Sequence, residues 1–221
     1  MFGRKKNKKP QIQSNIPESI LSLQRGMNSM PDIISPSSIE VDFNNIRIGE
    51  KLHKTFFVAG YPRYVNPNWL EPLINFDHSM DISMFIYPSQ TADVLSDLRR
   101  KIAEMEATIA SDVDEGLDVD PKVTASLEDA LSVQEELAKG IERFFQFSLY
   151  ISLISEDLQE LNEASKRLNA TLSSILLLPK VATLQMEDGF KSTIPLGEDR
   201  LFITRNMDTT SLASTFPFTS A

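Results

Sequence analysis

Residues 144–154 read FFQFSLYISLI, and this stretch decides the fold class. Large apolar side chains occupy the odd positions from Phe145 to Leu153. The positions between them hold Gln146, Ser148, Tyr150 and Ser152. A regular alternation of this kind predicts a β-strand that turns one face toward a hydrophobic core.

Two helical apolar stripes precede this strand. The first has spacings of three and four and consists of Leu95, Leu98, Ile102, Met105 and Ile109. The second consists of Val123, Leu127, Ala130, Leu137, Ile141 and Phe144. Between them lies an acidic stretch, and Pro121 restarts the helix with Asp120 available as N-cap. We therefore expect a long antiparallel helical hairpin over about residues 91–144.

The remaining patterns are short. Ile39, Val41 and Phe43 alternate with acids, which predicts a half-buried strand. A turn at Asn44-Asn45, a strand with Ile46 and Ile48, and a third strand at 55–59 complete an N-terminal β-meander. We also expect a strand at 82–87, a helix from Ser155 to about Leu177, and a strand at 181–184. The fold class is then α+β, a mainly antiparallel sheet with helices packed on one face.

Charge divides the chain into two regions. The net charge is −9, but residues 1–17 contain five basic residues and no acid, so the remainder carries −14. We expect residues 1–36 to be a disordered basic arm and linker, and residues 37–221 to be the α+β domain. A net-acidic domain disfavours direct nucleic-acid binding, while the arm allows weak contact with an anionic membrane.

Composition excludes several chemistries. The 221 residues include no cysteine, which removes disulfides, thiolate nucleophiles and thiolate metal sites. The eight glycines never have the spacing of a phosphate-binding loop, so we expect the chain neither to bind nor to hydrolyse ATP appreciably. The longest apolar run, 175–178, is too short to span a bilayer, and no secretory signal follows the basic start. We expect a soluble intracellular protein.

Each remaining candidate site favours a structural interpretation. The acidic stretch at 112–120 lacks the glycine and glutamate positions of an EF-hand loop. We expect His53 and His78 to be surface residues, and the aromatic residues of 144–150 to be sheet core rather than a platform for stacking bases. The hydroxyls of Thr209, Thr210 and Ser211 favour a helix cap or loop. The carboxylate pairs are expected on solvent faces: Glu104/Glu106, Glu135/Glu136 and Glu156/Asp157. We therefore assign no catalytic, cofactor-binding or metal-binding residue.

The last third of the chain resembles a known family. Residues 180–197 read KVATLQMEDGFKSTIPLG and residues 200–218 read RLFITRNMDTTSLASTFPF. These segments resemble the end of the N-terminal domain of the conjugative type IV secretion ATPases, the TraC/TrbE/CagE class. The matching residues are Gln185, Gly189, Ser192, Pro195, Leu196, Gly197, Arg205, Ser211, Leu212, Ala213, Phe216, Pro217 and Phe218. The order of elements upstream is also similar, so the resemblance covers about residues 30–221.

The resemblance implies a non-catalytic module. Members of the family continue into a RecA-like motor with Walker A and Walker B motifs, and these 221 residues contain neither motif. No nucleotide-binding residue is therefore carried over. The resemblance implies a docking module that links the motor to membrane subunits of a transfer channel, peripheral at the inner face of the cell membrane, with possible homo-oligomerisation. Two alternatives stay open: a stand-alone coiled-coil adaptor built around the hairpin, and an enzyme with a site that the sequence does not reveal.

Overall fold

The computed structural model describes residues 35–62 and 65–215. The chain divides into two units, Met1–Ser37 and Ser38–Ala221, and the fold described below belongs to the second. The expected disordered arm at 1–36 lies almost entirely outside the described residues.

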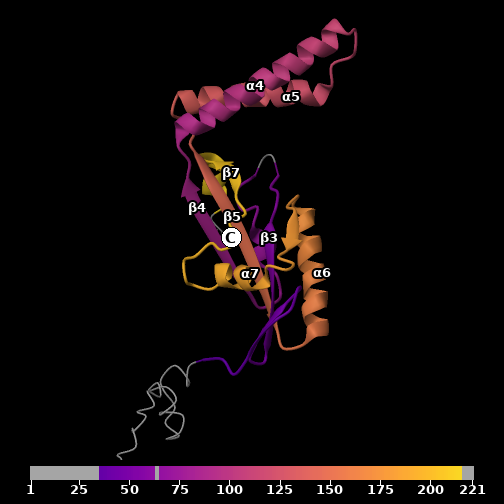
Figure 1. Cartoon of the computed structure of the whole chain (residues 1–221), viewed down its shortest axis with the longest axis vertical. Helices are drawn as coiled ribbons and strands as arrows, with labels where there is room; N and C mark the ends of the chain where they lie inside the picture. Colours follow the sequence, from indigo (N-terminus) through magenta and orange to yellow (C-terminus); the bar gives the residue numbers. More distant parts are fainter. Residues whose placement is uncertain (1–34, 63–64, 216–221) are drawn as a thin grey trace, which may run out of the picture. The chain divides into compact units, whose positions relative to one another are not determined.

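A seven-stranded sheet forms the body of the second unit, and all its strand pairs are antiparallel (Figure 1). Its strands are β1 (Ile39–Val41), β2 (Ile46–Ile48), β3 (Lys51–Val58), β4 (Met80–Pro88), β5 (Phe144–Ser155), β6 (Pro179–Val181) and β7 (Arg205–Asp208). The order is β1-β2-β3-β5-β4, with β6 paired to β3 and β7 paired to β5. This confirms the expected α+β class with a mainly antiparallel sheet.

Strand β5 is the centre of the sheet and pairs with β3, β4 and β7. The apolar face from Phe147 to Leu153 is fully buried, as the alternation predicts. The other face is buried as well, because Ser148, Tyr150 and Ser152 have no exposed surface. Because both faces of β5 are buried, another part of the chain packs on each side of the sheet.

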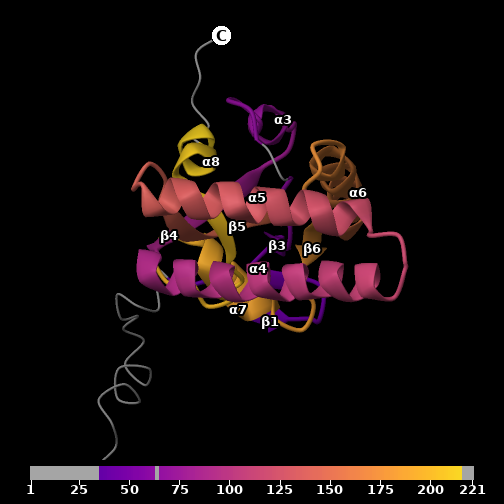
Figure 2. The same cartoon turned by 90° about the horizontal axis from the view of Figure 1, so that it is seen from above.

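Two helices provide these layers, and they lie on opposite sides of the sheet (Figure 2). Helix α6 (Leu158–Ser174) packs its leucines on the face of Phe147, whereas α7 (Met186–Thr193) packs against Tyr150 and the inner end of β6. The expectation that helices cover only one face is therefore wrong. The second face carries serine and threonine, which suggest a solvent-exposed face in the sequence. These side chains are small, so α7 packs closely against them.

At the N-terminal side, β1, β2 and β3 pair in sequence order. Ile39, Val41 and Phe43 are all more than half exposed, so this first strand is not half-buried as expected. The alternation correctly predicts a strand, but among the described residues no helix covers its apolar side chains. A short helix, α3 (Glu71–Ile74), precedes β4 and contributes Leu73 to the core.

Helices α4 (Thr91–Asp114) and α5 (Pro121–Ala138) lie side by side and are joined at their far ends by residues 115–120 (Figures 1 and 2). Helix α5 ends at Ala138, earlier than its stripe predicts. Ile141 lies beyond the helix and is 67% exposed, and Phe144 is the first residue of β5. The whole excursion is inserted between two neighbouring strands. The backbone N–H of Ser89 donates to the carbonyl of Phe144 at 3.0 Å, which closes its base.

Strand β4 forms one edge of the described sheet. Ile154 donates to the carbonyl of Ser79, and Ser89 donates to Phe144, so the odd-numbered backbone groups of this strand point toward β5. In an antiparallel ladder the alternate residues point the other way. The even-numbered groups, from Ile82 to Ile86, therefore face away from the sheet, and no described strand pairs with them.

Of the last segments, only the strand β6 was predicted, at 181–184. Strand β6 starts two residues earlier than expected and ends before Leu184, which has a left-handed backbone with φ of 65°. The chain then forms α7, β7 and α8 (Thr209–Ser214). These elements are only eight, four and six residues long, too short for a periodic apolar pattern.

Candidate functional site

The hairpin of α4 and α5 is the most distinctive surface of the described chain. Asp120 caps α5 as expected, because its carboxylate accepts from the N–H of Lys122 at 2.9 Å, and Pro121 occupies the first turn. Gly116 turns the chain at the tip with a φ of 70°, a backbone conformation that favours glycine. The local sequence thus positions two long helices against each other.

The apolar seam of this hairpin is only partly covered. Ile102 is the buried residue of α4, and Leu137 is that of α5. The other stripe residues within the two helices remain half-buried, and Val113, Leu117 and Leu131 are more than 40% exposed. Two helices without a third layer cannot enclose an apolar seam, so this surface keeps exposed apolar area.

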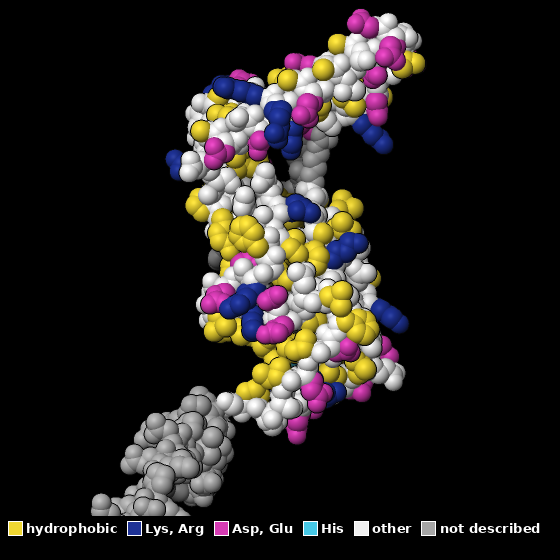
Figure 3. Space-filling view, in the orientation of Figure 1, with side chains coloured by type: hydrophobic (Ala, Val, Ile, Leu, Met, Phe, Trp, Pro, Cys, Tyr) yellow, Lys and Arg dark blue, Asp and Glu magenta, His cyan; other side chains and the backbone are white. Residues whose placement is uncertain are grey.

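Charge along the hairpin is strongly polarised. Between Ile102 and Pro121 the chain has seven carboxylates and no basic residue. Arg99, Arg100 and Lys101 lie nearer the sheet, and Figure 3 shows acidic side chains gathered toward the far end of the hairpin. The pKa of Glu135 is lowered by its hydrogen bond and ion pair with Lys139. The hairpin therefore offers an acidic, partly apolar surface, which suits a basic protein surface better than nucleic acid.

Threonine side chains attach the base of the hairpin to the sheet. Thr209 Oγ1 accepts from the N–H of Arg143 at 2.9 Å and donates to the same residue's carbonyl at 3.2 Å. The Glu142 carboxylate accepts from the backbone and hydroxyl of Thr210. Burial would raise the pKa of Glu142, but these hydrogen bonds outweigh it and the pKa is lowered. The cap of α8 is the Asp208 carboxylate, which accepts from the N–H of Ser211, and not one of these hydroxyls. The hydroxyls of Thr209 and Thr210 bond instead to the base of the hairpin.

A polar hollow of about 420 Å³ lies between the hairpin and the sheet. Its principal side chains are Gln90, Asp93, Asp97, Lys101, Gln146 and Asn206. Asp93, Asp97 and Lys101 are exposed to solvent. The hollow can make polar contacts with a docked segment.

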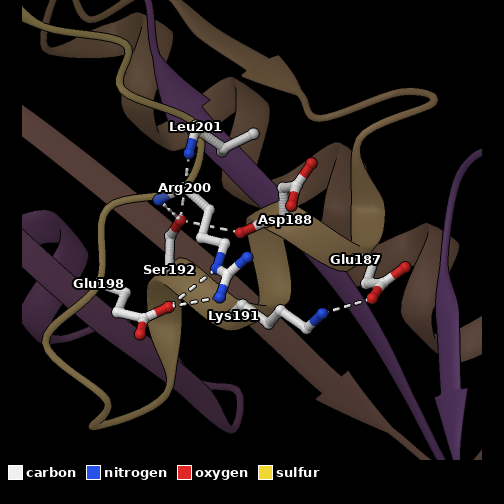
Figure 4. A network of polar contacts seen from close by, with 7 residues as sticks. All are labelled: Glu187, Asp188, Lys191, Ser192, Glu198, Arg200 and Leu201. Carbon is white, nitrogen blue, oxygen red and sulfur yellow. Dashed lines mark hydrogen bonds and ion pairs between the residues drawn. The ribbon is translucent and has the colours of Figure 1, made fainter.

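Gly189, Ser192 and Arg205, three residues of the family resemblance, make close contacts in the C-terminal layer, and Figure 4 shows those of Ser192. Phe216, Pro217 and Phe218 lie outside the described residues. Ser192 is fully buried; its hydroxyl donates to the carbonyl of Asp188 at 2.8 Å and accepts from the N–H of Arg200 at 2.9 Å. Gly189 lies so close to β3 that a Cβ there would be 3.0 Å from the Thr55 side chain. Arg205 donates through Nε to the carbonyl of Ala59 at 2.7 Å. Each of these residues has a structural role.

The loop after α7 is fixed by one carboxylate. Asp199 accepts from the Tyr150 hydroxyl at 2.7 Å, from Ser148 at 3.2 Å and from the N–H of Phe202 at 2.7 Å. Burial and the hydrogen bond to Asp199 raise the pKa of Tyr150, so this phenol stays neutral and donates. The fixed loop presents Phe202, which is 60% exposed and has a left-handed backbone with φ of 47°. A strained and exposed aromatic side chain is typical of a contact residue.

The two histidines lie apart in the fold, one on β3 and one in the loop before β4. His53 is 8% exposed, so the expected surface position is wrong; its ring packs edge-on against Phe190 with the centroids 4.9 Å apart. Burial lowers the pKa of His53. His78 is half-buried. The sequence did not reveal the burial of His53, because the ring that covers it, Phe190 of α7, lies far away along the chain.

The carboxylate pairs and both histidines lie within the described ranges, 35–62 and 65–215. In these ranges no three histidine or acidic side chains are placed to share a metal ion. The carboxylate pairs of α4 and α5 are exposed, and Glu156 is exposed ahead of α6, where Asp157 caps the helix by accepting from Glu160. The aromatic residues Phe147 and Tyr150 are fully buried, which confirms the expected sheet core.

Comparison with known proteins adds no identification to this geometry. No protein-family model matches the chain, and no curated protein matches it significantly.

Proposed function

We propose that the chain is a non-catalytic assembly module of a conjugative type IV secretion ATPase, which docks a motor domain to membrane subunits of the transfer channel. The observation that carries this proposal is the pair of segments at 180–197 and 200–218. Three of their family-like residues, Gly189, Ser192 and Arg205, make a close packing contact or a hydrogen bond within the C-terminal layer.

The hairpin supports a docking role within this proposal. It projects a partly covered apolar seam with seven clustered carboxylates, and the nearby loop presents the strained Phe202. Exposed apolar surface next to strong charge is typical of a protein-binding surface. The proposed partners are an ATPase motor domain, in the same chain or a separate one, and basic cytoplasmic segments of channel subunits.

The experiment is a co-purification of the full chain with the motor domain and the channel subunits encoded beside it. We expect both to be retained, and we expect the triple variant Asp112→Lys, Asp114→Lys, Asp118→Lys to lose the channel subunits. A matched control reverses three exposed acids away from the hairpin: Glu71→Lys, Glu163→Lys and Glu198→Lys. If neither partner co-purifies with the unaltered chain, the proposal is wrong.

A stand-alone adaptor is the second candidate, because α4 and α5 form a long two-helix arm. The coding sequence downstream discriminates between the two candidates. An in-frame Walker motif or an adjacent motor gene favours the secretion module, and neither is expected for an unrelated adaptor.

We further propose that membrane association is peripheral and depends on a protein partner. Among the described residues, no helix combines the length and apolar character needed to cross a bilayer. The basic residues of 4–9 alone would bind anionic lipid weakly, because screening acts over about 8 Å at physiological salt. Flotation with anionic vesicles should leave the isolated chain unbound. Quantitative flotation that survives deletion of residues 1–9 would contradict this.

A further inference from the structure

A groove between α6 and the sheet edge formed by β3 and β6 has a concentration of positive charge. Its volume is about 650 Å³, and each of its three elements contributes one lysine: Lys54, Lys166 and Lys180. The remaining lining residues are Phe56, Asn162, Ser165, Asn169, Pro179 and Val181. No carboxylate lines this groove, although the chain has 31 acidic and 22 basic residues. Figure 3 shows basic side chains along this side of the body.

Lys54 is the most unusual of the three lysines. It lies on β3 with only 8% of its surface exposed, and its ammonium donates to Asn162 Oδ1 at 2.7 Å. Burial lowers its pKa, and no described carboxylate lies within ion-pair distance. An ammonium has three donors, and a buried cation is costly without a counter-charge. The bond to the Asn162 oxygen uses one of the three donors and supplies no negative charge.

The surroundings of Lys54 favour an anion. Glu163 lies next to the groove on α6. Its carboxylate accepts a hydrogen bond from the side-chain amide of Gln159 at 3.2 Å, and it forms no ion pair with Lys54. The amide of Asn162 binds Lys54 through its oxygen and so keeps its two N–H donors for another group. Asn169 adds a second amide at the same helix face. Lysines from three elements and two amides from α6 thus line one groove. Its apolar lining consists of Phe56, Pro179 and Val181.

We propose that this lysine groove binds the phosphate group of a small phosphate ester. Lysine binds phosphate as a compact point charge, and a phosphate monoester carries a charge of about −1.5 to −2 at neutral pH. Three lysines therefore match a phosphate ester better than a singly charged carboxylate. The volume exceeds that of phosphate alone, so the organic part of the ester would lie over Phe56, Pro179 and Val181. A nucleic-acid polyanion does not suit the groove, because the rest of the domain is acidic.

Calorimetric titration of the full chain tests this, with inorganic phosphate, phenyl phosphate and benzoate at matched ionic strength. We expect saturable binding of phosphate, tighter binding of phenyl phosphate, and no binding of benzoate. Vesicles containing phosphatidic acid form a further arm. Binding to them in addition identifies a lipid as one source of the phosphate, whereas binding to soluble esters alone identifies a free metabolite.

Variants locate the site. Lys54→Met should weaken phosphate binding at least tenfold and leave the melting temperature unchanged or higher, because it removes a buried charge. Lys166→Met and Lys180→Met change exposed residues, so they test the groove even if Lys54→Met fails to fold. Lys122→Met on the hairpin is the matched control and should bind normally. Equal binding by all four variants or a preference for benzoate would overturn the proposal. A titration with sodium chloride at the same ionic strength that gives the same heat as phosphate would overturn it as well.

Discussion

At the scale of single residues, the second face of the sheet depends on small side chains. Gly189 and Ser192 of α7 lie against β3 and the loop after α7, and larger groups would not fit. A Cβ on Gly189 would be 3.0 Å from Thr55 Cβ and 3.2 Å from Ala182 Cβ, which is closer than ordinary packing allows. The contact with Thr55 is rigid, because a β-branched residue in a central strand cannot rotate away.

The substitution Gly189→Ala should therefore destabilise the fold. Overpacking costs about 1–3 kcal/mol, and the better helix propensity of alanine returns at most about 1 kcal/mol. Chemical denaturation measures the difference in unfolding free energy. Gly60→Ala is the matched control, because its Cβ would meet Leu178 only at 3.4 Å, and it should change stability by less than about 0.5 kcal/mol. Equal effects of the two variants would contradict the close contact.

Tyr150 should give the fold a dependence on alkaline pH. Burial and Asp199 raise its pKa above the unfolded value near 10, so folding favours the protonated phenol. The corresponding stability is fully present below about pH 10 and declines above it, by at most about 1.4 kcal/mol per pH unit for this group. Denaturation at pH 8 to 11 measures the slope. Tyr150→Phe should make that slope shallower, and an unchanged slope would exclude this phenol as its source.

At the scale of elements, the hairpin is stable only where its seam is buried. Ile102 is 7% exposed and Leu98 is half-exposed, so aspartate should be far more damaging at 102 than at 98. We expect Ile102→Asp to cost on the order of 3 kcal/mol or more, because it places an unpaired charge in the seam. Ala103→Asp, at an exposed neighbouring position, should be nearly neutral.

Hydrogen exchange of the α4 and α5 amides measures this effect directly. Ile102→Asp should accelerate exchange along both helices while the amides of β5 stay protected. If both variants keep the exchange rates of the unaltered chain, then α4 and α5 do not depend on each other.

Long elements could be predicted from sequence, and close contacts between distant segments could not. The alternation from Phe145 to Leu153 reveals β5, and Asp120 with Pro121 marks the start of α5, because these signals are local. The bond between Ser83 and the Ser192 carbonyl joins residues 109 positions apart, and no local pattern encodes it. The lysine groove escaped prediction for the same reason, since its three lysines come from three separate elements.

At the scale of the whole molecule, the hairpin is an insertion in a continuous sheet. Ser89 and Phe144 are hydrogen-bonded neighbours, and a two-residue Asn-Gly turn is the favoured connection for such a pair. Replacing residues 90–143 by Asn-Gly should leave a folded sheet that melts cooperatively. The lost contacts of Thr209 and Thr210 are offset by the lower closure entropy of a short loop.

Near-ultraviolet circular dichroism and a thermal melt measure this, and Gly-Pro in place of Asn-Gly is a control because proline disrupts the hairpin turn. A molten or aggregated product with Asn-Gly would show that α4 and α5 are part of the folding core. The shortened chain should also lose channel subunits in the co-purification and keep phosphate binding, since the lysine groove lies elsewhere.

The edge position of β4 has a consequence for solvent isotope labelling. The amides of Ser83 and Phe85 are held in the ladder with β5 and should exchange deuterium slowly. Those of Ile82, Met84 and Ile86 face away from it and should exchange within the dead time of the measurement. Nuclear magnetic resonance would then record a slow and fast pattern that alternates residue by residue along one strand. A ligand that adds a strand there would slow only the even-numbered signals, so the pattern reports occupancy of this edge without any introduced label.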